Sequence, residues 1–348
     1  MKASTRRRFK RSDIEVTKLG MGSAPLGGLY APVSADDARG ALEAAWDAGI
    51  RYFDTAPMYG RGRSEHLVGE FLRSRPAEDG FRISTKVGRL MTNARPGRVL
   101  PPEAPVNEFD TGWHSGLPFV ELFDYSYDGI MRSFDDSQQR TGLKRFDILY
   151  VHDIGRVTHG AAHDAHWSAL TRGGGFQALS ALRQAGLVDA IGLGVNEWEV
   201  IRDAMEEIDL DCCLLAGRYT LLDQGAAEQF LPLARARDVD VVIGGVFNSG
   251  ILAGVGAGPA KFDYVDAPPA IIERVERIAA ICARHDIPLA AAAIQFPIAH
   301  PAVAAILIGG RTALQVQQAV TWFETPIPPG LWADLLAADL IPANMTQG

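Results

Sequence analysis

Short apolar segments rich in β-branched residues alternate with longer amphipathic segments along most of the 348-residue chain. The short runs are typical of buried parallel strands, and the longer ones carry the apolar period of helices. The expected strands are residues 18–21, 50–54, 81–86, 147–152, 190–194, 211–216, 239–244 and 303–308. The expected helices are residues 34–47, 125–140, 175–184, 197–208, 226–237, 271–284 and 313–323. Eight such units favour an α/β fold of the closed (β/α)8 TIM-barrel type over an open doubly wound sheet.

An open sheet that binds a dinucleotide would need a glycine-rich turn between its first strand and helix. Here Gly20-Met21-Gly22 is followed by Ala24-Pro25, and the proline disfavours a helix start that cradles phosphate. No low-complexity linker divides the chain, and 47% hydrophobic residues supply a large core. We therefore expect residues 1–348 to form a single barrel domain.

Charge and composition exclude several classes of protein. A formal net charge of -8 argues against a nucleic-acid-binding protein. No apolar run is long enough to span a bilayer and no signal peptide is visible, so we expect a cytoplasmic protein. Its three cysteines fit a reducing compartment, and we expect the adjacent Cys212 and Cys213 to be buried strand residues. We expect the basic cluster at residues 6–11 to be a solvated tail. The sequence does not indicate the oligomeric state.

Two connections are longer than ordinary loops. Residues 88–123 carry five prolines and no clear period, and residues 245–270 are rich in glycine, alanine and proline. They follow the third and seventh expected strands, so both belong to the rim where barrel active sites lie. Long connections of this kind are typical of lids or binding loops.

Four polar residues lie at or just after the ends of expected strands: Asp54, Tyr59, Lys86 and His152. Such positions converge on one rim of a barrel. A tyrosine can act as general acid for a carbonyl, or as general base for an alcohol, if a neighbouring cation lowers the pKa of its phenol. Lys86 is the candidate cation, Asp54 could hold it, and His152 could place the substrate oxygen.

The segments around these residues, GIRYFDTAPMYG, ISTKVG and DILYVHD, resemble the signature regions of the aldo-keto reductase superfamily. The resemblance extends from Leu19 to about Thr325. It implies a (β/α)8 barrel that binds NAD or NADP without a Rossmann domain. It also implies that Tyr59 is the general acid/base, that Lys86 and Asp54 tune it, and that His152 orients the substrate.

Other segments, among them GSAPLGGLY and IGLGVNEWE, resemble the branch that contains D-threo-aldose 1-dehydrogenases (L-fucose or D-arabinose dehydrogenases) and pyridoxal 4-dehydrogenase. This implies a small-molecule substrate and oxidation of the anomeric carbon of an aldose, such as L-fucose, D-arabinose or L-galactose, to a lactone. Alternatives are a pyridoxal 4-dehydrogenase or a general aldehyde or ketone reductase. An alternative of another class is a redox-sensing regulatory subunit.

The same resemblance implies the cofactor contacts. Asn196 is the counterpart of a residue that binds the nicotinamide carboxamide, and Arg311 could pair with a 2′-phosphate. Ala216 and Gly244 stand where the family commonly has a glutamine and a stacking tyrosine. The remaining candidates are Phe247, Ser249, Gly250 and Leu252 for the pyrophosphate, and Gly310, Thr312, Gln315 and Gln318 for the adenosine.

Aromatic and histidine side chains on the expected rim are further candidates. Trp113 and His114 could line a sugar site, and Tyr30 and Trp198 are further aromatic candidates for the same site. The segment 159–167 contains His159, His163 and His166, which would suit a metal-dependent barrel hydrolase only if their imidazoles converged. Its composition favours an exposed loop after the fourth strand, so we expect no metal.

Overall fold

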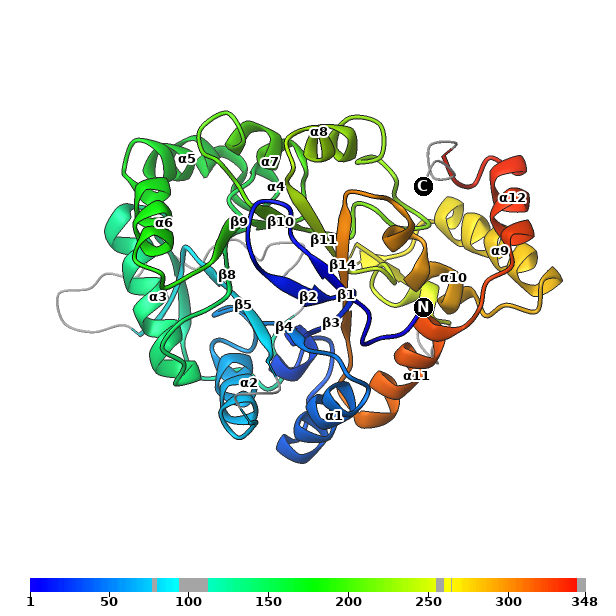
Figure 1. The fold of residues 1–348 in the computed structure, drawn as a ribbon, viewed down its shortest axis with the longest axis horizontal. Coiled ribbons are helices and arrows are strands. Elements are labelled where there is room, and N and C mark those ends of the chain that lie inside the picture. The colour runs from blue at the N-terminus through cyan, green and yellow to red at the C-terminus, as the bar shows by residue number, and fades with distance from the viewer. Residues whose placement is uncertain (77–79, 94–111, 255–259, 264, 343–348) are drawn as a thin grey trace.

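Eight parallel strands close into a barrel (Figure 1) in the computed structural model, which describes residues 1–76, 80–93, 112–254, 260–263 and 265–342. The order around the barrel is β10, β11, β14, β3, β4, β5, β8 and β9. Their bounds are β3 (Leu19–Gly22), β4 (Tyr52–Asp54), β5 (Arg82–Val87), β8 (Ile148–His152), β9 (Ala190–Val195), β10 (Cys212–Ala216), β11 (Asp240–Gly244) and β14 (Val303–Gly309). Each corresponds to an expected strand, and the predicted barrel is confirmed.

The helices lie outside the barrel (Figure 1). Those expected from the sequence are α1 (Ala35–Asp47), α3 (Tyr127–Thr141), α6 (Gly175–Gln184), α7 (Glu199–Ala204), α8 (Phe230–Ala236), α9 (Pro269–Arg284) and α11 (Ala313–Glu324). The side chain of Ser34 caps α1 by accepting a hydrogen bond from the Asp37 N–H, as its Ser-Ala-Asp-Asp start suggests.

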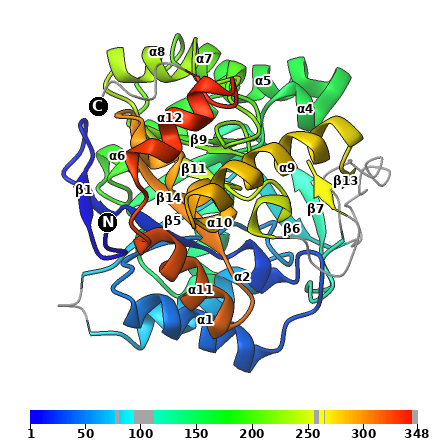
Figure 2. The same cartoon turned by 90° about the vertical axis from the view of Figure 1, so that its right-hand side faces the viewer.

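Further helices were missed: α2 (Arg63–Arg73), α4 (Arg156–His159), α5 (His163–Thr171), α10 (Leu289–Gln295) and α12 (Pro329–Ala337). Helix α10 has the sequence LAAAAIQ, which shows no polar face because it packs between neighbours (Figure 2). The loop expected at residues 159–167 is wrong, because the segment is largely helical. Its expected exposure is partly correct, since Asp164 and Ala165 are exposed whereas His163 is buried.

The amino-terminal residues form a hairpin across the barrel (Figure 1). Strand β1 (Arg6–Arg8) pairs antiparallel with β2 (Glu15–Thr17), and Phe9, Ile14 and Val16 are buried against inward-facing barrel residues. Arg7 donates hydrogen bonds to the carbonyls of Val303 (2.8 Å) and Pro301 (2.6 Å). The expected solvated tail is therefore wrong, because apolar residues next to the basic cluster anchor it.

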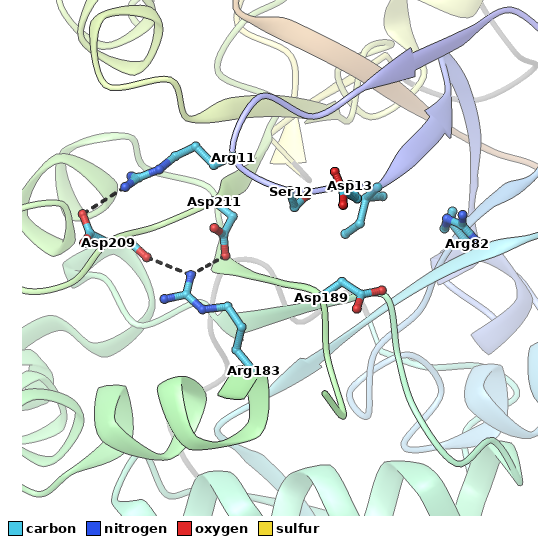
Figure 3. A pocket seen from close by; sticks show the side chains of 9 residues that line it. Arg11, Ser12, Asp13, Arg82, Arg183, Asp189, Asp209 and Asp211 are labelled. Atoms are coloured by element: carbon cyan, nitrogen blue, oxygen red, sulfur yellow. Dashed lines mark hydrogen bonds and ion pairs between the residues drawn. The ribbon is translucent and has the colours of Figure 1, made fainter. Parts of the chain in front are cut away.

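A hollow of about 520 Å³ lies beside this hairpin (Figure 3). Its residues come from the connection between β1 and β2, from the end of α6, and from segments that precede or begin β5, β9 and β10, so it opens at the rim opposite His152. Arg183 contacts Asp211 at 2.6 Å, and Arg11 contacts Asp209 at 3.2 Å. These paired charges lie at the amino ends of the strands, the rim that usually contributes to stability and not to catalysis. The lining residues are Arg11, Ser12, Asp13, Ile14, Arg82, Arg183, Asp189, Asp209 and Asp211.

Both long connections follow the carboxyl ends of their strands, as predicted. Residues 88–123 are not without secondary structure, because β6 (Arg89–Thr92) pairs antiparallel with β7 (Val120–Phe123). Residues 245–270 contain the short pair β12 (Lys261–Phe262) and β13 (Val265–Asp266). The parts of the two connections at 94–111, 255–259 and 264 lie outside the described residues.

Two features expected from composition can be compared with the structure. Cys212 and Cys213 are fully buried in β10, and both are free thiols. Within the described part of the chain, no helix has the length and apolar character needed to cross a membrane.

Two helical glycines provide a test of the packing between α2 and α3. A Cβ on Gly69 would lie 2.2 Å from the Thr141 carbonyl oxygen, whereas a Cβ on Gly40 would meet only Ala313 at 3.7 Å. We predict that Gly69→Ala lowers the free energy of unfolding by about 1–3 kcal/mol because the helices are forced apart. Gly40→Ala should raise it by about 0.5–1 kcal/mol through helix propensity. Denaturant unfolding measures both, and shifts of the same sign would contradict this packing.

Candidate active site

A buried ion pair joins two neighbouring barrel strands at the carboxyl end. Lys86 on β5 and Asp54 on β4 are 1% and 2% exposed. The Lys86 ammonium donates hydrogen bonds to Asp54 Oδ2 (2.7 Å) and to the Thr55 carbonyl oxygen (3.0 Å). A buried charge is tolerated only with partners of this kind, so each residue depends on the other.

Ser84 completes the support of this pair. Its hydroxyl donates a hydrogen bond to Asp54 Oδ1 at 2.7 Å, and Ser84 lies opposite Asp54 in the β4–β5 register. The sequence analysis did not identify Ser84, although its spacing from Lys86 indicates that it faces the same side of the strand. Ser84 is two residues before Lys86, and residues two apart on a strand share a face.

Tyr59 lies in the turn after β4, and the Lys86 nitrogen lies 4.6 Å from the centroid of its ring. Burial raises the pKa of Tyr59 above its ordinary value, and Lys86 offsets part of this shift. Lys86 thus lowers the pKa of Tyr59 as expected, but burial outweighs this effect, and the sequence does not reveal how deeply the phenol is buried. Burial lowers the pKa of Lys86, but Asp54 and Tyr59 raise it by more, so the ammonium stays protonated.

His152 is the last residue of β8 and is 4% exposed. Its ring is perpendicular to that of Tyr59, with 6.0 Å between the centroids. Burial, followed by the charges of Arg89 and Lys86, holds the pKa of His152 well below its usual range. The structure thus brings all four predicted catalytic residues together, with a neutral imidazole that can donate one hydrogen bond and accept another.

The predicted substrate residues fall in different places. The Trp113 ring lies 5.9 Å from that of Tyr59, and Tyr30 lines the cavity described below. His114 is exposed and its backbone N–H donates to the Gly28 carbonyl. Trp198 stacks on Phe230 at 6.3 Å instead of lining the cavity.

A cavity of about 1180 Å³ opens beside Tyr59 and extends to the start of α11. Most of the predicted cofactor residues line it: Asn196, Phe247, Ser249, Gly250, Gly310, Arg311, Gln315 and Gln318. Two do not. Leu252 is fully buried, and the Thr312 hydroxyl caps α11 by accepting from the Gln315 N–H at 3.4 Å.

Sequence reasoning missed Arg218 in this cavity. Its Nη1 donates to Asp223 Oδ2 (3.1 Å) and Asp263 Oδ2 (2.7 Å), and its Nε donates to the Asn196 carbonyl at 2.9 Å. The guanidinium thereby ties the end of β10 to the 245–270 connection. No motif marks the residue, because its partner Asp263 is distant in the sequence.

Part of the cavity wall is apolar. Ala216 and Gly244 are register partners on β10 and β11 and both line it, with Leu214 and Leu307 beside them. The resemblance described above implies a glutamine and a stacking tyrosine at the positions of Ala216 and Gly244.

Of the three histidines in residues 159–167, His159 and His166 lie against each other with 4.2 Å between their ring centroids, and His159 and His163 have hydrogen-bond partners elsewhere. His159 Nε2 and the Tyr125 hydroxyl are hydrogen bonded at 3.0 Å, and His163 Nδ1 lies 3.1 Å from the Ile154 carbonyl oxygen. Among the residues that the structure describes, no three His, Cys, Asp or Glu side chains are arranged to hold a metal ion. The hydrolase alternative finds no support here.

Comparison with known proteins agrees with this site. Residues 18–339 match the Aldo/keto reductase family. A pyridoxal 4-dehydrogenase from Microbacterium luteolum is 61% identical and covers 98% of this chain and 99% of its own length. A D-threo-aldose 1-dehydrogenase from a Pseudomonas species is 41% identical over the same shares of both chains. The chain belongs to the aldo/keto reductase family and is an oxidoreductase.

A solved structure is similar in fold. The glycerol dehydrogenase from Gluconobacter oxydans has a TM-score of 0.73 at 20% identity, covering 99% of this chain and 97% of that one. At this identity the likeness concerns the barrel alone.

Enzymes of this family use NAD or NADP, and the protein therefore takes a nicotinamide cofactor. The cavity fits such a group. Tyr59 and Arg311 both line it, glycines at 244, 245, 250, 309 and 310 contribute backbone to its wall, and Arg311 supplies a cation for phosphate.

Removing one member of the buried ion pair should be costly. We predict that Lys86→Met lowers the free energy of unfolding by about 3–5 kcal/mol, because Asp54 is left charged and buried. The double variant Asp54→Asn/Lys86→Met should recover part of the loss. As a control, Lys2→Met removes an exposed pair with Glu324 of the same 2.7 Å length and should cost about 0–1 kcal/mol. Equal losses in urea unfolding for the two lysines would argue against the buried pair.

Proposed function

We propose that the protein is an NAD(P)-dependent dehydrogenase that oxidises the hydroxyl-bearing carbon of a small cyclic hemiacetal to a lactone. Tyr59 is the general acid/base in this proposal. The observation that carries it is the contact between the Tyr59 side chain and the buried Lys86 ammonium beside a cavity of dinucleotide size. This arrangement supports proton transfer to or from an oxygen next to the cavity.

Pyridoxal is the first candidate substrate, and an aldose is the second. The 61% identity to a pyridoxal 4-dehydrogenase favours pyridoxal over the aldose that sequence motifs first suggested, and the 41% identity to an aldose 1-dehydrogenase supports the second. Both form cyclic hemiacetals with one flat or nearly flat face. The Trp113 ring beside Tyr59 suits either one.

Each of the four side chains has a separate role in the proposed reaction. Tyr59, as phenolate, takes the proton of the substrate hydroxyl, and Lys86 stabilises the phenolate charge. Asp54 keeps the ammonium protonated and oriented, and the neutral His152 positions the substrate oxygen. The bound nicotinamide would supply the hydride acceptor. The carbon thus loses a hydride and the oxygen a proton, which leaves the carbonyl of the lactone.

A substrate panel tests this function. Pyridoxal, L-fucose, D-arabinose and L-galactose are each assayed with NAD+ and with NADP+ by the absorbance of the reduced cofactor. We expect turnover with at least one hemiacetal and the highest kcat/KM with pyridoxal. A higher kcat/KM with an aldose would favour the second candidate. Tight cofactor binding without turnover of any substrate would contradict the proposed function and favour a regulatory subunit.

The raised pKa of Tyr59 predicts how the rate depends on pH. Oxidation needs the phenolate, so kcat/KM should rise about tenfold per pH unit through the neutral range. His152 should add no step there, because its pKa lies well below this range. Tyr59→Phe should lower kcat by about 10²–10⁴-fold and abolish the pH slope. As a control, Tyr219→Phe removes a buried hydroxyl that has no hydrogen-bond partner among the described residues and should change neither. A flat wild-type profile would count against this role of Tyr59.

A further inference from the structure

A second layer of polar side chains lies inside the barrel, just below the proposed catalytic residues. Tyr52 on β4, Ser84 on β5 and Tyr150 on β8 each stand two residues before one of them. Residues two apart on a strand share a face, so these side chains form the next layer of the same interior. Branched apolar residues normally fill such a layer. All three residues here are fully buried, so their hydroxyls need partners within the barrel.

The hydroxyls form one connected chain that ends on Asp54. The Ser84 hydroxyl donates to Asp54 Oδ1 at 2.7 Å. The Tyr52 hydroxyl lies 3.2 Å from Ser84 Oγ and 3.2 Å from the Tyr150 hydroxyl. The Cys212 thiol, a weak donor, reaches the Tyr150 hydroxyl at 3.9 Å. In the described part of the chain, the two tyrosine hydroxyls have no further hydrogen-bond partners.

The acceptor at the end sets the direction of every hydrogen bond. Asp54 is ionised beside the Lys86 ammonium, and a carboxylate can only accept. Ser84 therefore gives its one proton to Asp54 and accepts from Tyr52. Tyr52 then has no proton left for Tyr150 and must accept from it. Hydrogen bonds aligned in one direction polarise and strengthen one another.

Glycines on the adjoining strands leave room for the two rings. A Cβ on Gly20 of β3 would lie 2.9 Å from Cδ1 of Tyr52. A Cβ on Gly194 of β9 would lie 3.3 Å from Cβ of Tyr150 and 3.3 Å from Cε of Lys86. The barrel interior is therefore shaped around both tyrosines and the lysine together.

We infer that Tyr52, supported by Tyr150, is a positioning residue: its hydrogen bond to Ser84 strengthens the one that Ser84 donates to Asp54, and this keeps the carboxylate charged and aligned with Lys86. The chain does not carry protons to solvent, because its far end is a fully buried thiol.

The effect on Tyr59 has a definite sign. A carboxylate that is well stabilised leaves the proton on Lys86 and opposes a nearby phenolate less, so the chain favours ionisation of Tyr59. This consequence rests on the proposed function, in which Tyr59 is the general acid/base. The charged and titratable side chains around Tyr59 are Lys86, Asp54, Asp153, which Arg89 binds, and the neutral His152. Tyr52→Phe changes none of them directly.

The ionisation of Tyr59 can be measured without substrate. Tyr52→Phe keeps the ring and breaks the chain next to Ser84. In 13C-tyrosine-labelled protein, with Tyr59→Phe to assign the signal, we expect Tyr59 to ionise about 0.3–0.7 pH unit higher in Tyr52→Phe than in the wild type. Tyr219→Phe removes a buried hydroxyl that has no hydrogen-bond partner among the described residues and should cause no shift. An unchanged Tyr59 in Tyr52→Phe would overturn the inference.

A double variant separates positioning from structural support. Tyr52→Phe alone strands the Tyr150 hydroxyl and should lower stability in urea unfolding. Tyr52→Phe/Tyr150→Phe removes both hydroxyls, keeps both rings and should recover part of that stability. The Tyr59 shift should stay as large as in Tyr52→Phe, because Tyr150 acts only through Tyr52. A shift that disappears as stability recovers would indicate a structural role and overturn the inference. The double variant also carries the test if Tyr52→Phe does not fold.

Kinetics with the substrate that the panel identifies give a second readout. In Tyr52→Phe, kcat/KM should fall about two- to fivefold throughout the neutral pH range and keep its slope, because the ionisation of Tyr59 moves as a whole. A fall in kcat/KM without a shift of the Tyr59 signal would overturn the inference. If no panel substrate turns over, the proposed function fails, and the NMR titration still decides the role of Tyr52.

Discussion

The contact between the Lys86 ammonium and the Asp54 carboxylate is the interaction on which the rest of the site depends. Both groups are almost fully buried where β4 and β5 end, so neither is stable there without the other. The strand register brings Ser84 opposite Asp54 and thus fixes the carboxylate on its second oxygen. The same ammonium contacts Tyr59, which links a structural requirement of the barrel to the ionisation of the proposed catalytic group.

The location of the proposed catalytic residues could be predicted because barrel strands converge at their carboxyl ends. Asp54, Lys86 and His152 end apolar runs, and this alone brings them to one rim. What could not be predicted depends on contacts between segments far apart in the sequence. The pKa of Tyr59 depends on burial that only the folded chain defines, and the contact from Arg89 to Asp153 depends on a left-handed residue after β8 that no motif indicates.

The fold, like the site, has elements that could be predicted from the sequence and elements that could not. Strands with uniformly apolar sequences were correctly expected to be buried on both faces, whereas α10 was missed because its apolar sequence has no helical period. The hairpin of β6 and β7 is joined by a long proline-containing segment, so no short turn signal announces it. Trp198 follows the carboxyl end of β9, as expected for a residue on the rim, but its ring packs on Phe230 and does not line the cavity.

The central claim is that the buried Lys86 ammonium controls the ionisation of Tyr59. The most direct measurement is a pH titration of the Tyr59 ring carbon by NMR in 13C-tyrosine-labelled protein, with Tyr59→Phe to assign the signal, in the wild type and in Lys86→Met. The account predicts that Tyr59 ionises at a lower pH in the wild type, because removing the cation leaves burial unopposed. An unchanged or lower ionisation pH in Lys86→Met would contradict it.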